Sequence, residues 1–308
     1  MYQSETAMPF PRVIFRGLFA LATVFSLFMR SHEIRSAELS LTIPESGQTQ
    51  IITTGDGSRL MGRITRIGET DIEFQTDVGA IIIQRSKIRS VQIVPSDAIK
   101  KGRLWYSDPN RTRLLFAPTG RMLEKGEGYF ADYYVFFPTV NYGITERVSL
   151  GGGMSLFPTG NMADQVYFFT PKFGIKQSDR ANFAAGALII GIPGIDDEDV
   201  DSPILSLIYG VGTWGGSNRH LTLGLGYGMV DAKIADRPLI VIGGVSRITR
   251  RTALISENWM MPGLDGVLAS YGIRLFTENL SVDLALLNPI GEESIFPGIP
   301  YVDFVWNF

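Results

Sequence analysis

Cysteine is absent from this 308-residue sequence, and histidine occurs only as His32 and His220. The chain therefore has no disulfide framework, no thiolate metal site and no cysteine nucleophile, and histidine chemistry is poorly supplied. An excess of either charge is also lacking, because 28 basic residues face 31 acidic ones for a net charge of -3. This balance gives no field that would attract nucleic acid. We expect no cofactor, no metal and no nucleic-acid partner.

Long hydrophobic runs are lacking beyond residue 29. The single run, Val13 to Met29, follows Arg12 and is typical of the apolar region of an export signal, so residues 1–37 are predicted to be a signal peptide. An uncleaved membrane anchor is the alternative. Every later apolar stretch is cut by Gly, Pro or a charged residue within about ten residues, which is too short for a helix to span a bilayer.

Glycine and aromatic residues are plentiful. The chain contains 34 glycines, 11% aromatic residues and 45% hydrophobic residues. In short alternating segments this composition suits a β-barrel, whose walls bend at glycine and whose aromatic residues gather at membrane interfaces. A soluble β-sandwich shares the same bias, so composition alone does not separate the two.

Residues 45–95 alternate short strands with turns. The pattern opens with Asp56-Gly57-Ser58, continues with alternation from Arg59 to Ile67, and continues through Ile72-x-Phe74 to a closing segment from Ala80 to Ile93. The segment resembles the SH3-like and Sm-like small barrels, and that resemblance implies a small β-domain. Residues 96–110 are polar and contain Asp108-Pro109-Asn110, which predicts a linker.

One face of this small domain is rich in basic residues. Behind an export signal, such a face is either solvated or in contact with peptidoglycan or an envelope protein. Its members are Arg59, Arg63, Arg66, Arg85, Lys87 and Arg89.

Beyond residue 110 the segments lengthen to the roughly ten residues that a tilted strand needs to cross a bilayer. About twelve strands are predicted: 111–118, 128–143, 146–156, 165–176, 180–192, 203–214, 218–230, 237–248, 251–260, 266–276, 279–288 and 299–308. Short turns alternate with longer connections, as periplasmic turns and outer loops do in membrane barrels. An even count places both ends of the barrel on the side of the short turns, where a periplasmic domain must lie.

Alternation within the strands supplies a second test of the barrel prediction. A membrane strand presents an apolar face to lipid and tolerates small or polar groups on its inner face. In the strand 218–230, Leu221, Leu223, Leu225, Tyr227 and Met229 alternate with His220, Thr222, Gly224, Gly226 and Gly228. The predicted fold is therefore all-β: a transmembrane antiparallel up-and-down barrel over 111–308, preceded by a small periplasmic β-domain.

The C-terminal strand carries aromatic residues at alternate positions. Phe304, Trp306 and Phe308 share one face, with Tyr301 at the start of the strand. This motif resembles the C-terminal signal by which the assembly machinery of the outer membrane recognises bacterial barrels. The resemblance to porin-like outer-membrane barrels implies an outer-membrane location, with lipid and the barrel assembly machinery as partners and the small domain in the periplasm.

Several charged residues are predicted to face the lumen from neighbouring strands, where opposite charges would pair. They are Lys172, Glu257, Arg274, Asp283 and Asp303. Such a network either holds the lumen shut or lines a polar path for solutes.

An outer-membrane phospholipase is the rival class, but His220 is predicted to face inward beside a short turn, which is the wrong place for a lipid-acting residue. The aspartates at 197, 199 and 201 have the two-residue spacing of a calcium loop, yet Ser202 and Ile208 stand where an EF-hand needs Gly and Glu. We therefore predict no enzyme. A pore for small solutes is slightly favoured over a barrel with a closed lumen whose periplasmic domain binds peptidoglycan or an envelope partner.

Overall fold

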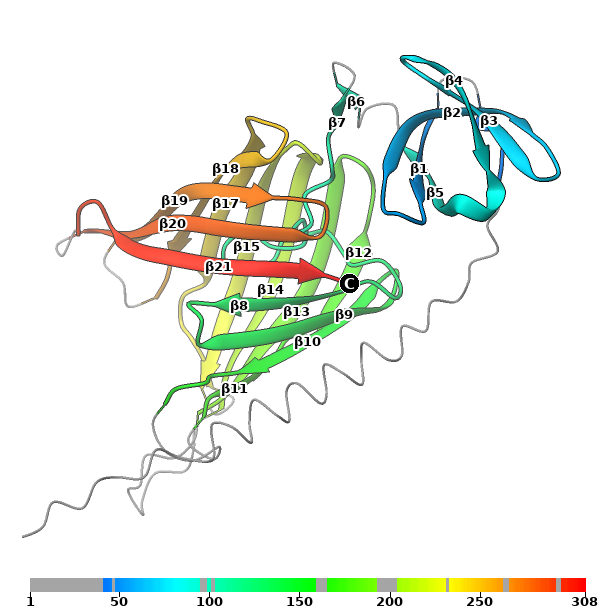
Figure 1. Ribbon diagram of the computed structural model, residues 1–308. Helices are drawn as coiled ribbons and strands as arrows, with labels where there is room; N and C mark the ends of the chain where they lie inside the picture. The colour runs from blue at the N-terminus through cyan, green and yellow to red at the C-terminus, as the bar shows by residue number, and fades with distance from the viewer. Residues whose placement is uncertain are drawn as a thin grey trace, which may run out of the picture. The chain divides into compact units, whose positions relative to one another are not determined.

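The computed structural model describes residues 41–45, 48–94, 99–100, 103–158, 165–192, 204–230, 233–262, 266–291 and 295–308. The chain forms two compact units, residues 1–105 and 106–308, and each is described by itself (Figure 1). The signal predicted over residues 1–37 lies outside the described residues. No helix in the described part of the chain has the length and hydrophobicity needed to cross a membrane.

The larger sheet among the described residues of the first unit is antiparallel and has the strand order β4-β3-β2-β1-β5. Its core consists of the buried Ile52, Ile64, Ile72, Phe74, Ile83 and Ile88. Its elements are β1 (Thr49–Thr54), β2 (Arg59–Ile67), β3 (Asp71–Thr76), β4 (Gly79–Gln84), the 3-10 turn η1 (Arg85–Lys87) and β5 (Ile88–Val94), followed by the short hairpin of β6 (Ile99–Lys100) and β7 (Arg103–Leu104).

Two details of this unit differ from the sequence prediction. The closing segment is not continuous, because η1 separates β4 from β5. In β2 the alternation holds up to Ile64, after which a register shift in the pairing with β3 leaves Arg66 exposed and lets Ile67 pack against the core. A bulge of this kind adds one residue to a strand and reverses the faces beyond it, and strict alternation does not anticipate it.

The second unit is a closed antiparallel barrel of twelve strands in which β11 and β12 together form one interrupted strand (Figure 1). Neighbours in sequence are neighbours in the wall, β9 pairs with β10, and β21 pairs with β8 to close the ring. The strands are β8 (Gly128–Tyr133), β9 (Phe137–Thr145), β10 (Val148–Met154), β11 (Tyr167–Phe169), β12 (Lys172–Lys176), β13 (Ala181–Gly191), β14 (Ile204–Gly216), β15 (Arg219–Val230), β17 (Leu239–Arg247), β18 (Thr252–Met260), β19 (Gly266–Phe276), β20 (Leu280–Gly291) and β21 (Ile299–Asn307), and the short β16 (Lys233–Ile234) pairs with β15.

The predicted number of strands is confirmed, but two of the predicted segments are wrong. Residues 111–118 form no strand, and residues 128–143 form two, β8 and most of β9, so the two errors cancel in the count. The turn between β8 and β9 contains Tyr134 and Val135 at φ angles of 53° and 67°. Hairpin turns that need positive φ normally use Gly, Asn or Asp, so this turn has no sequence signature.

Connections of different length lie at opposite ends of the barrel, as predicted. One end carries the tight turns that join β9 to β10, β14 to β15 and β19 to β20, together with the beginning of β8 and the end of β21. The opposite end carries the longer connections, such as those between β13 and β14 and between β20 and β21. The turn at 134–136 also lies at that end and is short.

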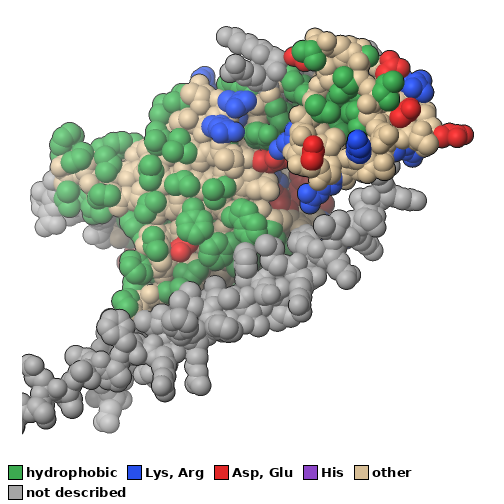
Figure 2. Space-filling view, in the orientation of Figure 1, with side chains coloured by type: hydrophobic (Ala, Val, Ile, Leu, Met, Phe, Trp, Pro, Cys, Tyr) green, Lys and Arg blue, Asp and Glu red, His purple; other side chains and the backbone are tan. Residues whose placement is uncertain are grey.

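The outer face of the barrel wall is apolar, and its inner face carries the buried polar and charged side chains together with a buried apolar cluster. In β15, Leu221 and Leu225 are 55% and 51% exposed, whereas His220 and Thr222 are buried. The same division holds for β19 and β20, where Ile273 and Leu284 face outward and Arg274 and Asp283 inward. Figure 2 shows hydrophobic side chains spread over the outer face of the wall. This inversion of the usual arrangement of soluble proteins matches a surface in contact with hydrocarbon.

Candidate functional site

The interior of the barrel is occupied by the chain itself. Residues 106–127, here called the lumen segment, precede β8 and contain no strand, although an isolated bridge joins Arg113 and Pro118. The two leucines at the centre of the segment, Leu114 and Leu115, are fully buried. They pack with residues of the wall that include Val245, Ile255 and Leu287. The candidate site is therefore the contact between the lumen segment and the wall.

Glu257 on β18 binds a bend of the lumen segment at residues 115–117. Its carboxylate accepts backbone N–H groups from Leu115, Phe116 and Ala117 at 2.9, 3.1 and 3.0 Å. The indole Nε1 of Trp259 donates to the same carboxylate at 2.6 Å. Three successive amides that have no partner in a strand or helix thus converge on one buried anion, which is the kind of charge-assisted contact that fixes a loop.

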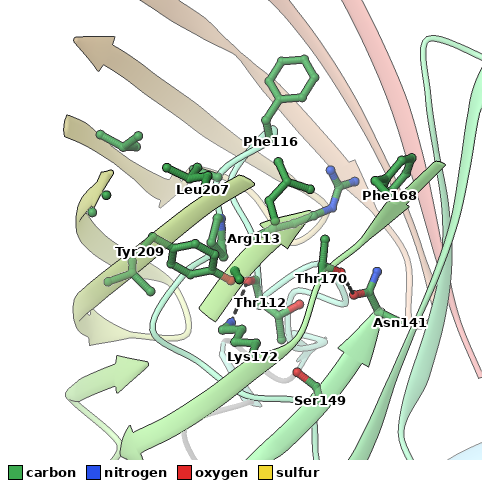
Figure 3. A pocket seen from close by; sticks show the side chains of 18 of the residues that line it. Thr112, Arg113, Phe116, Asn141, Ser149, Phe168, Thr170, Lys172, Leu207 and Tyr209 are labelled. Atoms are coloured by element: carbon green, nitrogen blue, oxygen red, sulfur yellow. Dashed lines mark hydrogen bonds between the residues drawn. The ribbon is translucent and has the colours of Figure 1, made fainter. Parts of the chain in front are cut away.

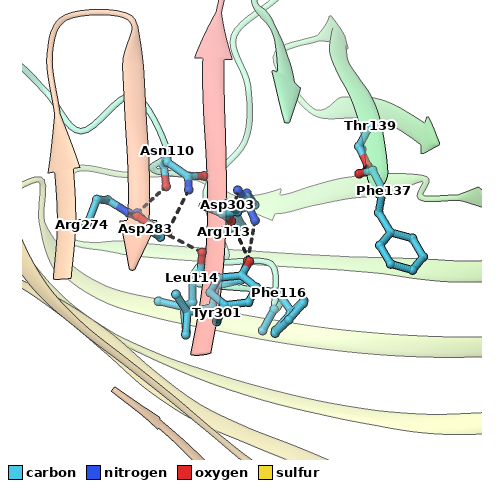
Figure 4. Close-up of polar contacts among 12 residues, drawn as sticks. Asn110, Arg113, Leu114, Phe116, Phe137, Thr139, Arg274, Asp283, Tyr301 and Asp303 are labelled. Carbon is cyan, nitrogen blue, oxygen red and sulfur yellow. Dashed lines mark hydrogen bonds and ion pairs between the residues drawn. The ribbon is translucent and has the colours of Figure 1, made fainter. Parts of the chain in front are cut away.

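Arg274 on β19 is the fully buried centre of a second cluster (Figure 4). It donates to both carboxylate oxygens of Asp283 at 2.8 and 2.7 Å, and to Asp108 of the lumen segment at 2.9 Å. It also donates to the backbone carbonyls of Asn110 and Leu114 at 2.8 and 2.9 Å. One guanidinium therefore joins two strands of the wall to three residues of the lumen segment.

Arg113 extends from the lumen segment toward β21. Its guanidinium donates to Asp303 at 2.6 Å and lies 4.5 Å from the centre of the Tyr133 ring. The hydroxyl of Tyr301 donates to the same Asp303 carboxylate at 2.7 Å. Asp303 thus binds both Arg113, which enters from the lumen segment, and Tyr301 of its own strand (Figure 4).

Lys172 on β12 binds the segment in another way. Its ammonium donates to the carbonyl of Arg121 at 2.6 Å and to that of Thr112 at 3.4 Å. The described residues provide no carboxylate that forms an ion pair with it. Lys172 is 9% exposed, so it is a buried amine whose partners among the described residues are neutral carbonyl oxygens.

Two glycines of the wall allow the lumen segment to approach closely. A Cβ atom at Gly143 would lie 2.1 Å from the carbonyl oxygen of Glu124, and one at Gly243 would lie 2.5 Å from Leu114 Cδ1. No real Cβ tolerates such distances, and the first obstacle is backbone, which cannot rotate away. Glycine at these positions therefore makes room for the segment.

The five predicted lumen charges all lie inside the barrel, but they do not form the single network that the sequence suggested. Only Arg274 and Asp283 pair with each other, and they are directly opposite in the register of β19 and β20. Glu257, Asp303 and Lys172 bind the lumen segment instead. His220 is also inward and buried beside the turn between β14 and β15, as predicted, and the aspartates at 197, 199 and 201 lie outside the described residues.

The partners that come from the lumen segment were not anticipated from the sequence. Asp108 and Asn110 are predicted to lie in a linker and Arg113 in a strand, yet all three are buried in the barrel. One signal was available, because 111–118 is shorter than the other predicted strands and ends at Pro118. A proline near the end of a short segment is a weak argument against a wall strand.

The aromatic residues of the C-terminal strand divide between the two faces of the wall. Tyr301 is buried and points inward, whereas Phe304 and Trp306 alternate with the inward Asp303 and Val305. The ring of Phe304 packs against that of Phe130 on β8 at 5.8 Å, and the ring of Trp306 lies 6.0 Å from that of Phe308. The aromatic face therefore lies along the junction of the first and last wall strands.

Among the described residues, the lumen segment lines two of the hollows of the barrel. Toward the end with the long connections is a cavity of about 250 Å³, called the lumen cavity, which includes Leu207, Tyr209 and Trp259 in its lining (Figure 3). Toward the end with the short turns is a more polar hollow of about 470 Å³, bounded by Arg121, Gln177 and other polar residues.

No family model matches the sequence, and no curated protein matches it. Among solved structures, two mutants of Rh. blastica porin are similar. One matches with a TM-score of 0.31 and 10% identity, the other with 0.33 and 9%, and each match covers 85% of this chain and 98% of the porin. Similarity at this level specifies neither a common strand number nor a common function.

Proposed function

We propose that this protein is an outer-membrane β-barrel whose lumen is held shut by residues 106–127. It is then a closed barrel at rest, the second of the two hypotheses drawn from the sequence, and not a permanently open pore. The observation that carries the proposal is that each predicted lumen charge either binds the lumen segment directly or pairs with a residue that does. A lining built to pass solutes would leave some of these groups to water.

The membrane location is supported by the outer surface of the wall. Large apolar side chains such as Ile208, Leu223 and Leu254 are 56%, 44% and 49% exposed there. The ring is closed by backbone pairing between β8 and β21, so hydrocarbon would meet no unpaired strand edge. A soluble protein of this kind would expose a continuous apolar band to water, which aggregates.

The closed state is supported by the strength of the contacts. Hydrogen bonds to charged groups contribute about 1.5–3 kcal/mol each, and the carboxylate of Glu257 alone accepts three backbone amides. The segment is further tied at Pro109, whose carbonyl accepts from Asn307, and at Gly120, whose N–H donates to Thr213. Departure of the whole segment would break these contacts together and would be rare at equilibrium.

Two measurements on the full-length protein test this function. We expect it to fractionate with outer membranes and to migrate differently on a gel before and after boiling. In a planar bilayer the folded protein is expected to give no channel openings. Recovery in the aqueous fraction would overturn the membrane assignment, and steady conductance of the wild type would overturn the closed lumen.

We propose that the first unit lies in the periplasm and binds peptidoglycan, an anionic polymer, through its basic side chains. Lys87 and Arg89 are exposed, whereas Arg66 is engaged with Asp71 and Glu73 at 3.3 and 3.5 Å. We expect the wild type to sediment with purified peptidoglycan and a variant that lacks residues 48–94 to stay in solution while keeping a heat-modifiable barrel. Equal sedimentation of the two would exclude the domain as the binding part, and binding to an envelope protein alone would replace the polymer as partner.

A further inference from the structure

The lumen cavity is mainly apolar, although it lies in the interior of a barrel with many polar groups. Leu207, Tyr209 and Val211 line it from β14, Val241 from β17 and Trp259 from β18, and Phe116 reaches it from the lumen segment. Water in such a space finds few hydrogen-bond partners. The walls therefore suit an apolar molecule better than a column of water, and the volume corresponds to a small one.

Polar groups gather on one side of this cavity. Lys172 lines it together with Thr112, Asn141 and Thr170, as Figure 3 shows. Of the other buried basic side chains in the barrel, Arg113 and Arg274 each have a carboxylate partner, and Arg121 donates to the carbonyls of Gly215 and Gly216. Lys172 has two carbonyl oxygens and no carboxylate partner among the described residues. An ammonium has three N–H groups, so one remains available beyond the two carbonyl contacts.

The apolar lining and the lysine without a carboxylate partner together indicate which kind of ligand would fit the cavity. An apolar body would occupy the space between Leu207, Tyr209 and Trp259, and a single anionic group beside Lys172 would supply the counter-charge that this lysine lacks. We propose that the lumen cavity binds a small amphipathic monoanion, such as a medium-chain carboxylate, with its anionic group at Lys172. Binding takes place in the closed barrel of the proposed function, but it is measured separately from conductance, so either idea can fail while the other stands.

The test uses the full-length protein in lipid nanodiscs and isothermal titration calorimetry, with the heat from empty nanodiscs subtracted. Octanoate is the probe, and octanol is the uncharged molecule with the same chain length. We expect saturable binding of octanoate and binding of octanol that is at least tenfold weaker. Octanoate heat that equals the empty-disc signal, or equal affinity for octanol, would overturn the proposal.

Two variants locate the site. K172M is expected to reduce octanoate affinity at least tenfold, but it also removes two contacts to the lumen segment. A second variant, G224L, leaves those contacts intact, because Gly224 lines the cavity and a Cβ there would meet Val241 at an ordinary 3.6 Å. We expect G224L to fill the space and abolish binding.

The matched control is G210L. Gly210 is adjacent in register to Gly224, since it pairs with Leu225, and it is exposed on the outer face, where an added Cβ would meet no atom within 4 Å. The same substitution there adds an apolar side chain outside the barrel and is expected to leave octanoate affinity unchanged. Octanoate binding that survives in G224L, or that is lost equally in G210L, would place the ligand elsewhere and overturn the proposal.

Discussion

Replacing residues 111–122 by a glycine–serine sequence of equal length is expected to turn a silent barrel into a conducting one. The replacement removes Arg113, Leu114 and Leu115, which fill the centre of the lumen, and keeps the wall intact. The change should be from no openings to discrete current steps in a planar bilayer. Because the wall carboxylates Glu257 and Asp303 would then lack the amides and the guanidinium that the segment provides, we expect the open variant to prefer cations.

A point variant provides a graded comparison. E257L removes the acceptor for three backbone amides, and a buried donor left without a partner costs about 1–3 kcal/mol. We expect intermittent openings and faster cleavage by trypsin at Arg111, Arg113 and Arg121, which are intermediate or buried in the closed barrel. L254A, on the outer face of the same strand, serves as the control and should remain silent. If the variant with residues 111–122 replaced gives no channel openings but still shows heat-modifiability, something other than the lumen segment closes the barrel.

The substitution R274M is expected to destabilise the barrel by about 3–5 kcal/mol, the range found when one partner of a buried ion pair is removed. Arg274 and Asp283 are both fully buried, and Asp108 is only 5% exposed, so the two carboxylates would lose their shared counter-ion without gaining water. The free energy of unfolding can be measured by urea titration of the protein in vesicles.

Two further variants separate charge from packing. R219M alters an exposed arginine of the barrel whose contact is a 3.3 Å hydrogen bond to Ser246, and it should change stability by no more than about 0.5 kcal/mol. The double variant R274M/D283L removes both members of the pair and should be more stable than R274M alone. If R274M behaves like R219M, the buried cluster has no structural role.

Much of the fold could be predicted because a barrel with an apolar outer face follows a simple rule of alternation along each strand. The alternation in β15 from His220 to Tyr227 follows from the need for apolar groups outside, and it appears in the structure residue by residue. Features that break a rule could not be predicted. The turn at Tyr134 and Val135 uses residues that avoid positive φ, and the shift at Arg66 reverses the faces of a strand.

For the candidate site, the charged residues of the wall could be predicted from the sequence, but the residues that they bind could not. The alternation of side chains along a strand shows which charged residues point inward, so Glu257, Arg274 and Asp283 could be named from the sequence. The alternation does not show which residue each charged group binds, because contacts such as that of Asp303 with Arg113 join residues far apart in the chain. The lumen segment has no periodicity of its own, and its contacts with the wall come from backbone amides, carbonyls and single side chains, so only the structure reveals them.

The pairing of β21 with β8 has a consequence for the order of assembly. The lumen segment is joined covalently to Gly128, the first residue of β8, and is bonded through Arg113 to Asp303 of β21. It is thus attached to both of the strands whose pairing closes the ring. Because both of its attachments are to strands that close the ring, we expect the lumen segment to be enclosed as the ring closes and not to be threaded into a finished barrel.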